Sequence, residues 1–217
     1  MPDYSIFISV IILTIIVRLI ISPLSYKSIK TQLQTKLLQP KLDKIKKEVA
    51  NKQEQAKLTL ELYKKHGVNP FSSFFVMLIQ LPIILALYWV FKDISDGINL
   101  EILYSFISIP EKLNLISFGF DLSEKSYILA FLTGFTQYIY LSFSSSMKST
   151  GEDSEKSEQA KMMAMVGKSM KYTMPVIITV FSYIIGGAVA LYWVASNVFM
   201  IFQELYIQKK LKNKKTT

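Results

Sequence analysis

Arg18 is the residue whose type and position most strongly indicate a function. It lies in an apolar run, residues 6–21, and residues 4–26 are long enough to span a bilayer as a helix. A guanidinium at that depth costs at least ~2.5–3.5 kcal/mol, so such a cation usually faces protein or a water-filled cavity. The alternative is snorkelling toward water, because the end of the span near Tyr26 is only about 12 Å away at the helical rise.

Other polar side chains in the apolar runs could line a groove with Arg18. Thr14 lies one turn before Arg18 on the same helix face. The remaining candidates are Gln80 in the second run, Gln137 and Tyr140 in the third, and Tyr192, Trp193 and Asn197 in the last. Polar side chains in lipid normally find partners on other helices, and Gln80 and Asn197 also fit that alternative. Tyr192 and Trp193 could instead belong to an interfacial aromatic belt.

The residues needed for several other chemistries are missing from the sequence. There is no cysteine and only one histidine, His66, so we expect no metal site and no cofactor. We find no Ser/His/Asp set, phosphate-binding glycine loop or paired intramembrane aspartates, and we expect no catalytic residues and no enzyme activity. The first acidic residue in a predicted span is Glu204, which argues against a midplane cation site or proton relay.

The apolar runs predict an all-α, polytopic membrane protein with five transmembrane helices. Runs at 4–26, 70–91 and 127–147 each fit one span. The run at 172–207 exceeds one span and fits two short ones, with a tight turn at Gly186-Gly187. The alternative is one long tilted helix with an interfacial tail.

The distribution of charge predicts the topology. Residues 27–66 carry eleven Lys and four acids, residues 148–171 carry five Lys and four acids, and the chain after Gln208 carries five Lys and no acid. Residues 93–124 reverse this balance, with six acids and one Lys. The positive-inside rule therefore places the first three segments in the cytoplasm and 93–124 outside. Five spans with the N-terminus outside and the C-terminus in the cytoplasm satisfy all four placements.

Residues 27–66 show helical periodicity without an apolar run. Leu38, Leu42, Ile45 and Val49 form one stripe, and Leu58 and Leu62 continue it after a polar break. We predict two antiparallel amphipathic helices, a cytoplasmic hairpin in which Pro40 kinks or restarts the first helix. Its Lys-rich face could lie on anionic lipid, or meet ribosomal RNA or incoming chains. A short interfacial helix is predicted at 102–109 and a polar loop at 148–161.

These observations divide the chain into eight segments. They are the first transmembrane helix (1–26), the cytoplasmic hairpin (27–66), the second transmembrane helix (67–92), an extracytoplasmic segment (93–124), the third transmembrane helix (125–147), a cytoplasmic loop (148–171), the fourth and fifth transmembrane helices (172–207) and a basic cytoplasmic tail (208–217).

Four stretches resemble the YidC membrane-protein insertases, the bacterial relatives of the mitochondrial and chloroplast insertases. They are IVRLIISPL at 16–24, LQPKL at 38–42, LYKKHGVNP at 62–70 followed by LIQLPI at 78–83, and MP at 174–175 followed by ALYWVASN at 190–197. Each motif alone is modest, but their order and spacing agree across the whole chain.

The resemblance implies five spans around a groove that is open to cytoplasm and lipid and closed outside, with Arg18 as the groove arginine. The chain departs from the family in three places: SSFF at 72–75 and Gly186-Gly187, where the family often has Pro, and Tyr140, where it often has Gln. We expect a trimmed or minimal form of this family, without its periplasmic domain and its additional N-terminal signal or span.

We therefore expect a membrane protein insertase and chaperone of the bacterial inner membrane. The expected partners are nascent membrane proteins, the lipid bilayer, the ribosome and the Sec translocon, with no specific DNA binding. The alternative is a small transporter or anion channel that uses Arg18 as its site, although we find no internal repeat or matched pair of broken helices. A structural scaffold would leave Arg18 unexplained.

Overall fold

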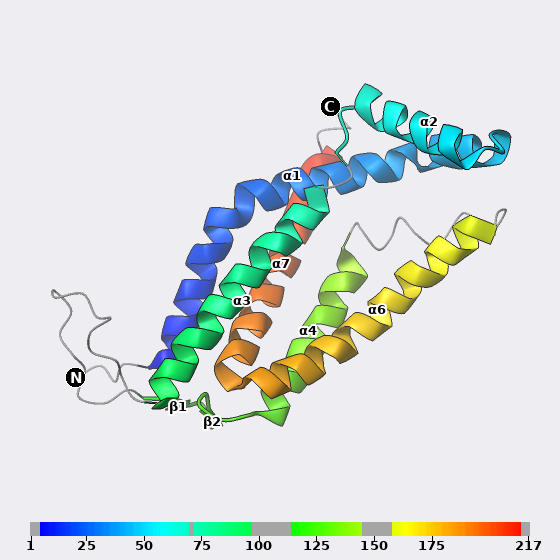
Figure 1. Ribbon diagram of the computed structural model, residues 1–217. Coiled ribbons are helices and arrows are strands. Elements are labelled where there is room, and N and C mark those ends of the chain that lie inside the picture. The colour runs from blue at the N-terminus through cyan, green and yellow to red at the C-terminus, as the bar shows by residue number, and fades with distance from the viewer. Residues whose placement is uncertain (1–4, 70–71, 97–113, 145–157, 214–217) are drawn as a thin grey trace. The chain divides into compact units, whose positions relative to one another are not determined.

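The computed structural model describes residues 5–69, 72–96, 114–144 and 158–213, which are mainly helical (Figure 1). The helices are α1 (Ile6–Glu48), α2 (Lys52–Lys65), α3 (Ser72–Asp96), α4 (Tyr127–Phe143), α6 (Glu158–Ile185) and α7 (Gly187–Asn213), and a two-stranded antiparallel sheet is formed by β1 (Ile116–Ser117) and β2 (Phe120–Asp121). The predicted interfacial helix at 102–109 and most of the predicted loop at 148–161 lie outside the described residues.

Contacts divide the chain into two compact units. The first unit comprises Met1–Ile20, Ile79–Tyr138 and Met174–Phe199, and the second comprises Ile21–Leu78, Ile139–Thr173 and Met200–Thr217. The functional candidates Arg18, Gln80 and Tyr192 fall in the first unit. The segments predicted as a hairpin fall in the second.

Helix α1 is continuous from Ile6 to Glu48 and includes both Pro23 and Pro40. The predicted first span and the first helix of the predicted hairpin therefore lie along one helix. Chain reversal begins after Glu48, and Asn51 caps the start of α2 by accepting a hydrogen bond from the Gln53 backbone N–H at 2.9 Å.

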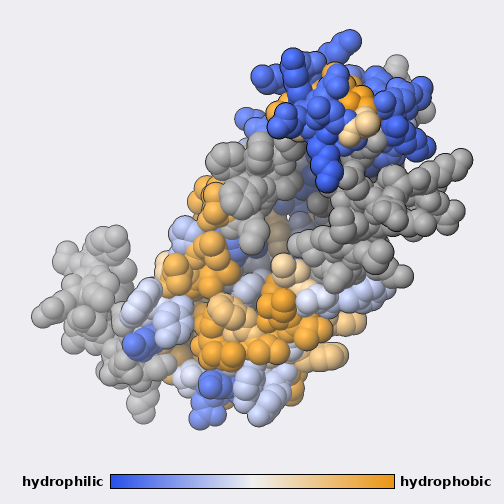
Figure 2. Space-filling model, turned by 45° about the vertical axis from the view of Figure 1, so that its right-hand side comes forward, coloured by the Kyte–Doolittle hydropathy of each residue, from blue (hydrophilic) through white to orange (hydrophobic). Residues whose placement is uncertain are grey.

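Two described helical stretches, Ile6–Ile45 and Gly187–Leu211, are long and apolar enough to cross a membrane. Three shorter apolar stretches accompany them, at Leu78–Lys92, Tyr127–Phe143 and Lys171–Ile185. Large hydrophobic side chains such as Ile12, Leu85 and Val180 point outward, and Figure 2 shows hydrophobic residues gathered on the visible face of the first unit. An exposed apolar surface of this kind marks a face that meets lipid or another apolar partner.

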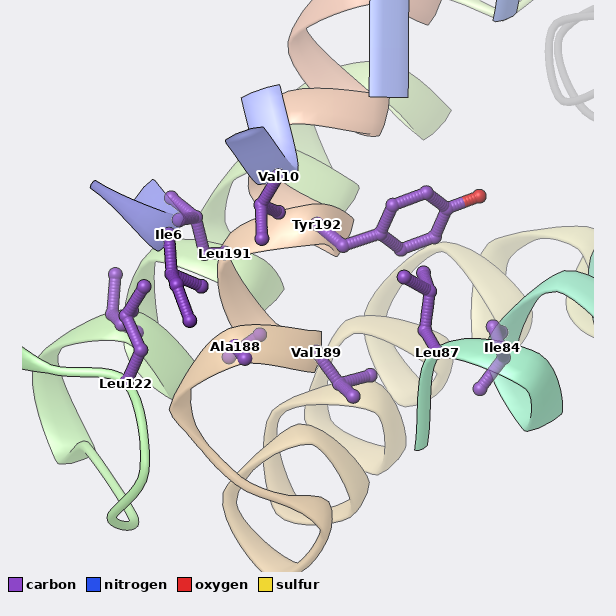
Figure 3. Packing of buried hydrophobic residues seen from close by; sticks show 11 residues of the cluster. Ile6, Val10, Ile84, Leu87, Leu122, Ala188, Val189, Leu191 and Tyr192 are labelled. Carbon is purple, nitrogen blue, oxygen red and sulfur yellow. The ribbon is translucent and has the colours of Figure 1, made fainter. Parts of the chain in front are cut away.

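The core of the first unit gathers around the start of α7 (Figure 3). Val189, Leu191 and Tyr192 pack with Val10 of α1 and Leu87 of α3. The remaining buried members of this cluster are Ile6, Ile84, Leu122, Leu129, Ala188 and Ala190. The two alanines lie where small side chains allow helices to approach closely.

The β1–β2 segment is held against the N-terminal ends of α1 and α7 by backbone hydrogen bonds. The Ile6 N–H donates to Asn114 O at 3.2 Å, the Gly187 N–H donates to Glu124 O at 2.9 Å, and the Ala188 N–H donates to Leu122 O at 3.1 Å. A Cβ at Gly187 would lie 2.8 Å from Glu124 O, so only glycine permits this approach. The predicted turn between the last two helices is present, since α6 ends at Ile185 and α7 begins at Gly187.

The second unit has a smaller apolar core, in which α2 packs against the later part of α1. Leu38, Leu42 and Val68 are buried together, with Leu62 and Tyr63 packed partly against them. Two members of the predicted apolar stripe, Leu38 and Leu42, are therefore core residues. The visible surface of this helical pair is mostly hydrophilic (Figure 2).

Candidate functional site

Three of the predicted site residues form one hydrogen-bonded chain across three helices of the first unit. Arg18 Nη2 on α1 donates to Gln80 Oε1 on α3 at 2.9 Å, and Gln80 Nε2 donates to the Tyr192 hydroxyl on α7 at 3.0 Å. A guanidinium can only donate, which requires the amide oxygen of Gln80 to face Arg18 and its NH₂ to face Tyr192. The three residues are more than 60 positions apart in sequence at each step.

The positively charged side chain of Arg18 is buried within the first unit. Its side chain is only 5% exposed, and that of Tyr192 is 1% exposed. A buried cation requires polar partners to replace part of its hydration, and Gln80 supplies one of them. Gln80 itself is half-buried. A buried positive charge with a partly accessible amide beside it is an arrangement that can attract acidic or polar groups.

Thr14 lies on the same helix as Arg18 and is fully buried. Its hydroxyl donates to Val10 O, four residues earlier, at 2.6 Å. This bond satisfies the hydroxyl within its own helix, as is common for threonine in apolar helices. Thr14 is therefore a polar residue one turn before Arg18 whose hydroxyl bonds within its own helix.

Asn197 belongs to a second polar group, which joins α7 to α4. Its Nδ2 donates to Thr133 O at 3.3 Å and to Thr136 Oγ1 at 3.1 Å. Thr133 Oγ1 is placed to donate to Leu129 O at 2.8 Å in its own helix and to Ala190 O at 3.2 Å on α7. Asn197, Thr133 and Thr136 are all buried. Asn197 thus takes the alternative role considered from sequence, an interhelical hydrogen bond.

Sequence reasoning missed the close approach of α4 and α6. A Cβ at Gly134 would lie 2.9 Å from Pro175 O and would also meet the Thr179 side chain. A single glycine inside an apolar helix is the signal that could have indicated it, because small residues allow transmembrane helices to pack backbone to backbone.

The remaining predicted site residues are Trp193, Gln137 and Tyr140. Trp193 is half-buried and contacts the Phe181 ring edge-on, with centroids 6.5 Å apart. Gln137 is half-buried in the first unit, and Tyr140 is half-buried in the second. Which of them faces a substrate stays a prediction.

The second unit has polar contacts of its own along α7. Gln203 Nε2 donates to Ser22 Oγ on α1 at 2.7 Å, and Gln208 Nε2 donates to Phe143 O, at the end of α4, at 3.0 Å. Gln208 Nε2 also donates to Glu204 Oε1 at 2.9 Å, and Glu204 is fully buried. The carbonyl of Phe143 ends its helix, so Gln208 satisfies a group that α4 itself leaves unpaired. Among the residues that the structure describes, no three His, Cys, Asp or Glu side chains gather to hold a metal ion.

Two long apolar helices, α1 and α7, and the shorter apolar stretch of α3 are joined by a buried arginine network, which is a feature of α-helical membrane proteins. A family model described as 60Kd inner membrane protein matches residues 2–215, so the chain belongs to this family. The chain is 34% identical to the membrane protein insertase YidC of Oceanobacillus iheyensis over 96% of this chain and 76% of the relative. It is 31% identical to the insertase YidC of Fusobacterium nucleatum, over 94% and 86%.

A third relative is the membrane protein insertase MisCA of Bacillus subtilis, 33% identical over 93% of this chain and 69% of the relative. These matches confirm the resemblance to the insertases that the sequence motifs indicated. They cover both units, because the matched residues run through nearly the whole chain.

Proposed function

We propose that this chain is a membrane protein insertase in which Arg18, Gln80 and Tyr192 form the polar site for the hydrophilic part of a substrate. The observation that carries the proposal is the hydrogen-bonded chain from Arg18 to Tyr192. An insertase must lower the cost of moving a short polar segment past lipid. A cation held beside an amide and a phenol can replace part of that segment's hydration.

The driving force in this mechanism comes from the substrate. An apolar substrate helix gains about 0.8 kcal/mol per methylene group moved from water into lipid, so no nucleotide is required. Acidic residues in the translocated tail are attracted to Arg18 while the apolar helix moves along the lipid-facing side. Thr14, Gln137, Tyr140, Trp193 and Asn197 complete the proposed groove or hold its walls.

The proposed topology has five transmembrane helices, with the N-terminus outside and the C-terminus in the cytoplasm. Two long apolar helices and three shorter apolar ones support it, together with the excess of Lys at 27–66, 148–171 and after Gln208. The hairpin of α2 and the later part of α1 is then cytoplasmic, and residues 93–124 are outside. Because the chain has no cysteine, single cysteines test this directly. Ser123→Cys, at an exposed position of the segment 93–124, should label from outside, and Ser154→Cys only after permeabilisation. External labelling of Ser154→Cys would contradict five spans.

Nascent membrane proteins are the proposed substrates. The ribosome and the Sec translocon are proposed partners, and the basic tail (Lys209, Lys210, Lys212, Lys214 and Lys215) is proposed to add salt-sensitive affinity for ribosomes or anionic lipid. Truncation after Gln208 should then spare insertion of a substrate that is added without ribosomes.

A small transporter or anion channel is the alternative function that Arg18 could serve. Reconstitution of the purified chain into liposomes separates the two. The insertase account expects a single-span test protein to become protected from protease, with no flux of chloride or small solutes. Arg18→Ala should lower insertion at least tenfold, whereas Lys30→Ala, which removes an exposed cation from the same helix, should leave it unchanged. Anion flux without insertion, or full insertion by Arg18→Ala, would refute the proposal.

A further inference from the structure

The tip of the β1–β2 hairpin has an unusual residue for its backbone conformation. Ser117 pairs with Phe120, which leaves Phe118 and Gly119 as a two-residue turn. Both have positive φ, 53° for Phe118 and 79° for Gly119, the pattern of a type I′ turn. Asn, Asp or Gly normally occupies the first of these positions, and a bulky residue there is strained. The turn alone therefore does not account for phenylalanine.

The packing of the hairpin does not account for it either. The Phe118 side chain is 77% exposed and meets Phe7 of α1 along one side, with ring centroids 5.0 Å apart. Ile116, in β1, is 62% exposed. The β1–β2 hairpin thus exposes two large apolar side chains, Phe118 in its strained turn and Ile116 in β1.

The position of the hairpin identifies those surroundings. Backbone hydrogen bonds hold its flanking residues to Ile6 and Gly187, and these are the first residues of the two helices long enough to cross a membrane. Figure 1 shows β1 and β2 beside the turn between α6 and α7. In the five-span topology proposed above, on which this inference rests, the β1–β2 hairpin therefore lies where the apolar helices begin, at the boundary between hydrocarbon and headgroups.

Neighbouring residues of the same unit have the composition of that boundary. Tyr127 opens α4, is 75% exposed, and stacks on Tyr183 of α6 with centroids 4.5 Å apart. Lys125 Nζ lies 5.8 Å from the Tyr183 ring centroid. An exposed tyrosine that stacks on a half-buried one beside a lysine is typical of a membrane interface, where rings sit among headgroups and the ammonium reaches water.

We propose that the tip of this hairpin, Phe118 with Ile116, inserts into the lipid interface of the bilayer leaflet at this end of the helices. The apolar surface is continuous with the outward face of α1, because Phe118 packs on Phe7, and Ile8 and Ile12 of the same helix are exposed. The hairpin then anchors the segment 114–124 at a fixed depth, in addition to the function proposed above. The hairpin tip then binds the interface between the lipid hydrocarbon and the headgroups.

The absence of native cysteine allows a direct test by spin labelling of the full chain in phosphatidylethanolamine/phosphatidylglycerol liposomes. A nitroxide at Phe118→Cys should be at least threefold more accessible to oxygen, relative to a water-soluble nickel chelate, than one at Ser123→Cys. Ser123 is the matched control because it is exposed in the same segment and hydrogen-bonds to Asp121. Equal nickel accessibility at both positions would overturn the proposal. Protection of position 118 from both reagents would overturn it in favour of a protein partner.

A second variant removes the side chain without disturbing the turn. Phe118→Asn creates Asn-Gly, the sequence that a type I′ turn favours, so the hairpin should keep its fold and the protein its melting temperature in detergent. A nitroxide at Ile116→Cys should then report a shallower position with Phe118→Asn than with Phe118. Phe118→Trp should retain the depth. An unchanged depth for Phe118→Asn would show that the aromatic ring does not insert.

Discussion

The first unit and the helical hairpin of the second unit, formed by the later part of α1 with α2, bury different kinds of side chain. In the first unit, a buried arginine and a buried asparagine are hydrogen-bonded across helices, and the outward surface is apolar. In the second unit, the helical hairpin buries three hydrophobic side chains, Leu38, Leu42 and Val68. Its visible surface is mainly hydrophilic (Figure 2). The first arrangement suits a solvent that offers no hydrogen bonds, and the second suits water.

This difference predicts a difference in local stability. Side-chain hydrogen bonds and close backbone approaches join four helices of the first unit, α1, α3, α4 and α7, and glycine brings α6 against α4. The helical hairpin of the second unit is held by a small hydrophobic cluster and by one short helix, α2. Regions with few buried apolar contacts open first.

The largest expected effect is local unfolding of the hairpin by Leu42→Ala. Truncating a buried leucine costs about 2–5 kcal/mol, which is comparable to the stability that so small a core can supply. Amide exchange in Lys52–Lys65 should rise sharply, whereas amides in α4 stay protected. Leu60→Ala on α2 is the control, since Leu60 is exposed. Already in the unmodified protein, amides between Lys41 and Leu62 should exchange faster than those of α3. Equal protection would remove the contrast between the units.

The next-largest effect is the loss of stability when either of two glycines is replaced by alanine, and its physical cause differs between them. Gly134→Ala forces a methyl group against Pro175 O and Thr179, and overpacking of this kind costs about 1–3 kcal/mol. Gly67→Ala meets no atom within 4 Å but has a φ of 62°, so its cost is the backbone strain of about 1–2 kcal/mol.

Thermal unfolding in detergent and a second substitution distinguish the two causes. Thr179→Ala should partly rescue Gly134→Ala, because it removes one of the atoms that the new methyl group meets, and should leave Gly67→Ala unchanged. No rescue of Gly134→Ala would mean that α4 and α6 do not approach as described.

A smaller effect is expected from the hydroxyl of Thr133. Thr133→Val loses the hydrogen bond to Ala190 O on α7, and such bonds in membrane proteins average ~0.6 kcal/mol. Thr35→Val removes a hydroxyl that bonds only within its own helix in the second unit, to Thr31 O, and should have no measurable effect. Unfolding in mixed micelles measures both. A larger loss for Thr35→Val would reverse the comparison.

The smallest expected effect is on how the stability of the helical hairpin depends on pH. Burial raises the pKa of Tyr63 above its ordinary value of 10.0. The unfolded hairpin therefore loses this proton first, so the Tyr63 contribution to stability is constant below about pH 10 and is lost as pH rises through the folded pKa. Tyr63→Phe should flatten the alkaline decline of hairpin stability measured by circular dichroism. An identical decline in both proteins would show that Tyr63 ionises freely.

Sequence reasoning identified individual residues better than their partners. Arg18, Gln80 and Tyr192 could be singled out because each polar group lies in an apolar run, and Leu38 and Leu42 because of their helical spacing. That Gln80 bridges the other two could not be predicted, since the bond depends on how three helices pack. The sequence allows two roles for Asn197, a groove residue or an interhelical partner, and its contacts with Thr133 and Thr136 favour the second.

Backbone features were the hardest to predict. The sequence predicts that Pro40 kinks or restarts the helix, and the restart is wrong, because α1 runs without interruption from Ile6 to Glu48. The β1–β2 hairpin could not be predicted from the sequence, because each strand has only two residues, too few to show an alternation of apolar and polar side chains. Its turn also carries phenylalanine where the usual Asn or Asp would have signalled it.

The central claim, that Arg18 acts through its charge on the translocated tail, is tested most directly by insertion of paired substrates. Two single-span test proteins that differ only in an acidic or a neutral tail are presented to the unmodified chain, Arg18→Lys and Arg18→Ala at matched amounts in liposomes. Lysine keeps the charge and can still donate to Gln80, but lacks the planar fork.

The account predicts that Arg18→Lys inserts both substrates at half the normal level or better. Arg18→Ala should lose at least tenfold for the acidic tail and less than threefold for the neutral one. Equal loss of both substrates in Arg18→Ala, accompanied by a lower melting temperature, would mean that Arg18 supports the fold, and would contradict an electrostatic role in insertion.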